Sequence, residues 1–238
     1  MNQLVIDYVW EHNGDDSLIY ADNFPGAFVR GKSKEEALSK FTDEIKSYIM
    51  WRDSVDFDGI IALNEVGEHI TSLNVCDADS EAIFESEQLP LTESEYAELK
   101  SLALKSAEYF QRLYDSIPNK NITCNPKRDT FYGAIPVTAS EMYVHTKNVN
   151  EYYFAQIGID ADNEPDIYTC REKAFNILEN QSDYLQNTVF DGAYNEKWSL
   201  RKVLRRFIWH DRIHAKAMWR MAVKLFGAKN IENPFYFS

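Results

Sequence analysis

Two histidines four residues apart, His210 and His214, stand in the middle of a stretch with the pattern of an amphipathic helix. The stretch Trp198–Arg220 contains neither glycine nor proline, and Ser199 is a suitable N-cap. Its apolar positions alternate steps of three and four along one helix face, and this series includes both histidines: Leu200, Val203, Phe207, His210, His214, Ala217 and Met221. Two imidazoles one turn apart on an inward face can hold one metal ion.

A third histidine, His145, belongs to the expected inward series of an earlier helix, which reads Met142, His145, Val149, Tyr152 and Gln156. A single histidine on a core stripe is more often a hydrogen-bonded packing residue, and that alternative stands beside the metal hypothesis. Three such histidines on helices that share a core favour a metal site. The remaining two, His12 in a turn and His69 near a strand, are most simply surface or structural residues.

The helices that must position these histidines lie in residues 89–238, which predict an all-α four-helix bundle. Thr92 with Glu95, and Thr138 with Glu141, have the spacing of capping boxes. Helices are therefore expected over about 92–116, 138–158, 169–187 and 198–220. Residues 117–138 contain three prolines and are expected to form a long connection, which often packs over a site.

Residues 1–88 predict a small α+β domain. Short β-branched and apolar runs indicate strands at 2–10, 17–21, 27–30, 59–63 and 68–75, with 82–86 as a further candidate. Ser33 and Glu36 begin a helix with a capping-box pattern. The change from period two to helical spacing near Leu89 places the domain boundary between residues 88 and 89.

The charge of the chain is unevenly distributed. Residues 1–90 contain 19 acidic and 6 basic residues, a net charge of −13 that equals that of the whole chain. An acidic first third repels phosphate backbones, so no nucleic-acid partner is expected. The last helix is basic, and its simplest interpretation is a solvated outer face, or one that faces the acidic first domain; these residues are Arg201, Lys202, Arg205, Arg206, Arg212 and Lys216.

The compartment is predicted from what the sequence lacks. No apolar run reaches the roughly 18 residues of a membrane span, and the first residues, MNQLVIDYVW, do not have the pattern of a secretory signal. Cys76, Cys124 and Cys170 are odd in number, far apart and in no CxxC pattern. The sequence therefore predicts a cytoplasmic protein with reduced thiols and no membrane association.

At the second and fourth of these helices the chain resembles the DinB-like (YfiT-like) family. The matching segments are EMYVHTKNVNEYYF and WSLRKVLRRFIWHDRIHAKAMWR, and the second begins with the family's Trp-Ser/Thr-apolar-Arg pattern. The resemblance covers roughly residues 90–228, and it implies a four-helix bundle in which His145, His210 and His214 are the metal ligands. The chain departs from the pattern at Phe207, where many relatives carry a further histidine that is not a ligand.

The first domain resembles the HicB-like antitoxin fold over about 60 residues, on the segment YADNFPGAFVRGKSKEEALSKFTDEIKSYI. Pro25-Gly26 lies between two strands, Gly31 precedes the helix, and Glu36-Ala37 lies in its first turn. HicB proteins usually carry a separate DNA-binding segment, and none is evident here. The resemblance therefore implies a structural or partner-binding unit rather than an antitoxin.

Three imidazoles would leave one position on an ion open for water or substrate, which is the pattern of a catalytic site. DinB-like relatives include thiol S-transferases that use bacillithiol or mycothiol, and some are thiol-dependent isomerases. The resemblance thus implies a divalent metal ion, zinc or nickel first, with a low-molecular-weight thiol and a small-molecule substrate. Catalytic residues other than the ligands are not identified. The alternative is a non-enzymatic metal- or ligand-binding protein whose first domain docks a partner, and a homodimer is compatible with either.

Overall fold

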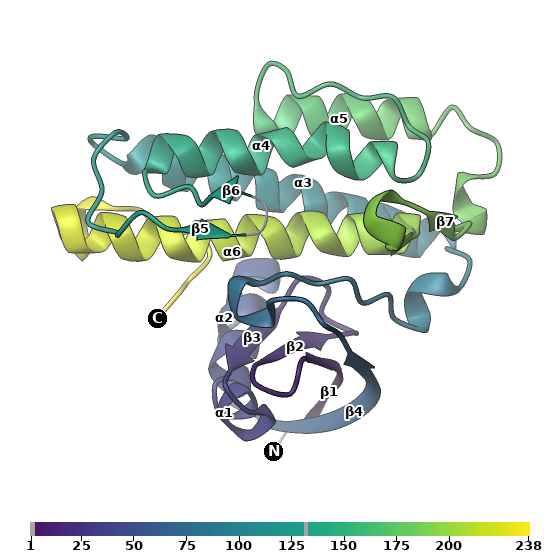
Figure 1. Cartoon of the computed structure of the whole chain (residues 1–238), viewed down its shortest axis with the longest axis horizontal. Helices are drawn as coiled ribbons and strands as arrows, with labels where there is room; N and C mark the ends of the chain where they lie inside the picture. The colour runs from purple at the N-terminus through teal and green to yellow at the C-terminus, as the bar shows by residue number, and fades with distance from the viewer. Residues whose placement is uncertain (1–2, 131–132) are drawn as a thin grey trace.

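The computed structural model describes residues 3–130 and 133–238, and its central element is helix α6, Leu200–Phe226 (Figure 1). In this view α6 lies between a β-sheet below and the other long helices above. The side chain of Ser199 accepts a hydrogen bond from the Lys202 N–H, so the predicted N-cap is confirmed. The helix ends at Gly227, whose φ of 83° suits a glycine.

The first half of the chain forms a mixed four-stranded sheet with two helices. The strand order is β3-β2-β1-β4, in which β1 is antiparallel to β2 and parallel to β4. The strands are β1, Gln3–His12; β2, Ser17–Ala21; β3, Phe28–Gly31; and β4, Ile60–Ile70. The helices are α1, Lys34–Ser39, and α2, Phe41–Asp53. They cover one face of the sheet, where their apolar residues pack with those of β1 and β3.

Two strand predictions in this half are wrong. Residues 60–70 form one continuous strand, because a bulge opposite Tyr8 and Val9 absorbs the polar interval that suggested two strands. Residues 82–86 form no strand, since side chains bind their backbone instead. Glu11 accepts a hydrogen bond from the Ala82 N–H, and Glu87 accepts one from the Phe84 N–H.

The second half contributes three more long helices, α3, Glu93–Ser116; α4, Ala139–Ala155; and α5, Ile167–Leu178. Both predicted capping boxes are present, at Thr92 with Glu95 and at Thr138 with Glu141. Helix α5 begins two residues earlier than predicted, after its N-cap Asp166, and it is shorter because it already ends at Leu178.

The predicted fold class, an α+β domain followed by an all-α four-helix bundle, is wrong. The second half also contains two small antiparallel ladders, between β5, Asp129–Thr130, and β6, Gly133–Ala134, and between β7, Phe190–Asp191, and β8, Lys197–Trp198. Each strand of these ladders is two residues long, which is too short for an alternation of apolar and polar side chains to be seen in the sequence. The result is an α+β architecture throughout, with strands in both halves.

The hydrophobic core is continuous across the predicted boundary at residues 88 and 89. One cluster of buried residues includes Ile6 of β1, Phe41 of α2 and Phe207 of α6. The turn at Gly26 approaches α6 so closely that a Cβ atom there would lie 2.4 Å from a side-chain carbon of Ile208. A second cluster places Trp209 of α6 against the other face of the sheet. The division into two domains stays a prediction.

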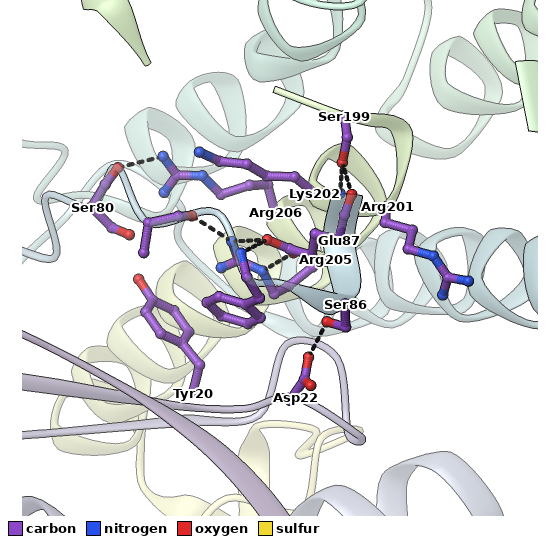
Figure 2. Close-up of polar contacts among 12 residues, drawn as sticks. Tyr20, Asp22, Ser80, Ser86, Glu87, Ser199, Arg201, Lys202, Arg205 and Arg206 are labelled. Atoms are coloured by element: carbon purple, nitrogen blue, oxygen red, sulfur yellow. Dashed lines mark hydrogen bonds and ion pairs between the residues drawn. The ribbon is translucent and has the colours of Figure 1, made fainter. Parts of the chain in front are cut away.

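Four of the six basic residues predicted for this face of α6 are buried, namely Lys202, Arg205, Arg206 and Arg212. The interpretation as a solvated face is therefore wrong, and the alternative, a face against the acidic first half, is confirmed (Figure 2). Arg205 forms an ion pair with Glu87, and these side chains are only 3% and 5% exposed. Three consecutive backbone carbonyls, Ser80, Glu81 and Ala82, accept hydrogen bonds from Arg206, Lys202 and Arg205 respectively. Farther along the helix, Arg212 and Lys216 both pair with Glu44 of α2. The basic face of α6 therefore joins the helix to the acidic first half.

We expect the Glu87→Gln substitution to destabilise the fold by about 3–5 kcal/mol, because it leaves the buried Arg205 charge without its carboxylate. Urea unfolding at neutral pH measures the free energy. The control is Asp191→Asn, which breaks the exposed pair with Lys197 and should cost less than about 1 kcal/mol. Equal stabilities of the two variants would contradict a structural role for the buried pair.

Candidate metal centre

Helices α4 and α6 bring the three predicted ligands together. His145 comes from α4, and His210 and His214 come from α6. One ring nitrogen of each lies within 4.8 Å of those of the other two. The Nε2 atoms of His145 and His210 are 3.2 Å apart, and the ring centroids of His210 and His214 are 4.5 Å apart. The predicted proximity of the triad is confirmed.

The triad is buried on one side and open on the other. His210 is 8% exposed, His214 is partly buried, and His145 is exposed. The prediction that His145 points into the core is therefore wrong in detail. The buried face of α4 shares only Met142 with the predicted stripe and continues through Thr146, Asn150 and Tyr153. His145 lies at the edge of that face, where it reaches α6 and still contacts solvent.

The environment keeps all three imidazoles neutral. Burial lowers the pKa of His210 well below its usual value, and the nearby His214, His145 and Arg206 lower it further. Burial, followed by the effects of His145 and Arg30, lowers the pKa of His214 to about 3. His145 is exposed at its edge, but the surrounding protein still removes part of its ring from water, and this desolvation lowers its pKa. Neutral imidazoles offer the free ring nitrogen that a metal ion requires.

The spacing of the nitrogens suits a shared ion. Two imidazole nitrogens that each bind one zinc ion at 2.0–2.1 Å with a near-tetrahedral angle lie roughly 3.3 Å apart. The 3.2 Å between the Nε2 atoms of His145 and His210 matches this separation. The donor set of three imidazoles suits zinc, nickel, iron or copper, and it does not by itself select among them.

A buried ionic network holds α6 directly behind the triad. Asp211, next to His210 in the chain, accepts hydrogen bonds from Arg171 of α5 at 2.7 and 3.1 Å and from the Ser106 hydroxyl of α3. Because both of its oxygens are engaged and the side chain is fully buried, Asp211 is not available to act at the metal site. Its pairing fixes the rotation of α6, and therefore the direction in which His210 points.

The other two histidines each lie against a carboxylate. His12 contacts Glu68 at 3.0 Å and His69 lies 3.5 Å from Glu81, which agrees with the interpretation of both as surface or structural residues. A groove of about 750 Å³ lies along α3 and includes none of the three histidines. Within this groove, Glu179 accepts hydrogen bonds from Tyr96 and Lys100. The sequence did not reveal that Arg30 lowers the pKa of His214, because no local pattern relates β3 to α6.

The lowered pKa values predict how stability depends on pH in protein stripped of metal by a chelator. Below about pH 6.5 the unfolded chain binds protons at these histidines and the folded chain does not. The free energy of unfolding therefore decreases as the pH is lowered. The slope should be about 1.4 kcal/mol per pH unit for each such histidine. Urea unfolding between pH 7 and 5 measures it, and His214→Gln should reduce it by one such increment. A stability that stays constant over this range would contradict the assignment.

Comparison of the chain with protein-family models, with curated proteins and with solved structures finds no match. The resemblances to the DinB-like and HicB-like families therefore stay predictions. Within the part of the chain that the structure describes, no helix combines the length and the apolar character needed to cross a membrane.

Proposed function

We propose that His145, His210 and His214 bind one divalent metal ion, zinc or nickel, and that the protein is a metal-dependent S-transferase that uses a low-molecular-weight thiol. The observation that carries the proposal is the convergence of three neutral imidazoles from two helices, open to solvent at His145. The sequence resemblance to DinB-like proteins supports the type of reaction.

The residues of the chain have separate tasks in this function. The three histidines hold the ion through ring nitrogens and leave a position toward solvent. A bound divalent ion supplies a positive centre that lowers the pKa of a coordinated thiol. The buried residues around His210, among them Phe207 and Tyr153, exclude water from the inner side of the site. A small electrophilic substrate would approach from the open side near His145.

A second candidate is a non-enzymatic metal- or ligand-binding protein whose first half docks a partner. The observation that favours it is the outer strand β4, whose free edge carries exposed apolar side chains. These residues are Ile60, Leu63, Val66 and Ile70. The exposed position of His145 favours the enzyme instead, since a purely structural metal is usually enclosed by four protein ligands.

We expect His145→Ala, His210→Ala and His214→Ala each to lower metal content and affinity and to leave helical circular dichroism unchanged. Packing along the helices, rather than the ion, supplies most of the core. Elemental analysis and circular dichroism of the purified variants test this, with His69→Ala as the control that should keep the metal. Metal binding at full stoichiometry and affinity in all three triad variants would exclude the site. Joint loss of metal and fold would make the ion structural.

The two candidate functions differ in turnover. The metal-loaded protein should consume a thiol and a generic electrophile such as 1-chloro-2,4-dinitrobenzene faster than buffer does, and His210→Ala should remove that excess rate. A panel that includes bacillithiol, mycothiol and cysteine identifies the thiol. Metal binding without turnover for any pair would leave the non-enzymatic candidate.

We further propose a cytoplasmic protein that forms a homodimer and binds no nucleic acid. Free Cys76, Cys124 and Cys170 suit a reducing compartment, and recovery mainly from a secreted fraction would contradict it.

The free edge of β4 supports the dimer, because two copies paired antiparallel about Glu65 would set Ile60 of each opposite Ile70 of the other. Light scattering measures the mass, and Ile70→Lys should shift a dimer toward monomer. The ion pairs that engage the α6 cations argue against a surface for phosphate backbones.

A further inference from the structure

Arg30 of β3 belongs to the other half of the chain, and yet its charge lowers the pKa of His214 in the triad. Phe28 and Arg30 point to the same face of the sheet, because they are two residues apart on one strand. The Phe28 ring packs against Trp209 of α6, with centroids 6.2 Å apart. Ile213, one helical turn after Trp209, packs against the same cluster. Arg30 is two residues after Phe28 on this face of the strand, which agrees with its electrostatic effect on His214.

Arg30 differs from most other arginines of the chain in its lack of a carboxylate partner. Eight of the ten arginines form ion pairs, whereas Arg30 and Arg220 have no carboxylate within 4.0 Å among residues 3–130 and 133–238. The Nη1 of Arg30 donates a hydrogen bond of 2.9 Å to the Cys76 carbonyl, which fixes the guanidinium without neutralising it. The nearby Asp77 is paired with Arg128.

An exposed and oriented guanidinium without a direct carboxylate partner suits an anionic ligand. In a chain with a net charge of −13, carboxylates are plentiful, and yet none of those described occupies this cation. The fork of a guanidinium matches a carboxylate in two parallel hydrogen bonds, which are stronger than those between neutral groups.

We propose that Arg30 is the anion-binding residue of the triad site and that the small molecule entering the site is a thiol that carries a carboxylate. The sulfur would lie at the three histidines and the carboxylate at Arg30, so the two halves of the chain would each bind one end of the ligand. This inference rests on the proposed metal site for the position of the sulfur, and it adds the charge of the ligand and the residue that selects it.

The proposal can be tested with pairs of thiols that end in either a carboxylate or a hydroxyl group. Their binding to the cobalt-loaded protein is followed by the sulfur-to-cobalt charge-transfer absorption band. The pairs are 3-mercaptopropionate with 3-mercaptopropanol, and 4-mercaptobutyrate with 4-mercaptobutanol. In at least one pair the unmodified protein should bind the acid roughly tenfold or more tighter than the alcohol, as expected for a charge-assisted pair. Arg30→Gln should bring that ratio close to one.

Arg220→Gln is the matched control, because it removes the same charge from the other arginine without a carboxylate partner. It should keep the preference for the acid. Equal binding of acid and alcohol by the unmodified protein would overturn the proposal, and so would a preference that survives in Arg30→Gln, which would indicate direct chelation by the carboxylate. If Arg30→Gln changes the cobalt affinity but not the ratio of acid to alcohol affinity, Arg30 affects only the electrostatics of His214, and the anion subsite is wrong.

Failure of the metal site would be recognised separately, since cobalt would then not bind at all. The anion subsite can still be measured in that case by modification of Arg30 with phenylglyoxal, followed by peptide mass spectrometry. 3-Mercaptopropionate should slow the modification of Arg30 and should not slow that of Arg220, whereas 3-mercaptopropanol should protect neither. Absence of selective protection would overturn the subsite independently of the metal.

Discussion

The burial of cations along α6 is the constraint on which the rest of the structure depends. A guanidinium removed from water needs a carboxylate and further hydrogen-bond acceptors, or the desolvation cost is not offset. Glu87 meets this need for Arg205, and Glu44 meets it for Arg212. These carboxylates come from the first half of the chain, so α6 can be buried on this side only when that half is folded against it. The acidic character of residues 1–90 is thus partly an internal complement to one helix.

The same helix carries the histidines, so the ion pairs also decide where the histidines point. Asp211 is bound to Arg171 and Ser106 on one side of α6, and Arg212 is bound to Glu44 on another. With neighbouring residues held by different elements, α6 can neither rotate nor slide without breaking a buried pair. His210 and His214 are therefore presented to α4 in one fixed orientation, which is the preorganisation that a metal site requires.

The charges around the triad favour neutral imidazole rings, and they would favour a negatively charged ligand. Burial and neighbouring guanidinium groups lower the pKa of His210 and His214, which opposes protonation and keeps ring nitrogens free. The guanidinium of Arg30, which donates a hydrogen bond to the Cys76 carbonyl, acts in the same direction on His214. A divalent ion bound by three neutral ligands would keep its own positive charge and strengthen this preference. The first half of the chain thus affects the protonation of the triad as well as supporting α6.

The sequence by itself determined the N-caps of α3, α4 and α6 and set His210 and His214 one turn apart, because helical spacing and capping are local properties. It did not determine the two small ladders, since these depend on backbone pairing between segments without a side-chain period. It also did not show that most of the basic face of α6 is buried, that His145 lies at an exposed edge, or that Arg30 lowers the pKa of His214. Those features depend on which surfaces meet, and a charged residue in sequence looks the same whether its partner is water or a carboxylate 118 positions away.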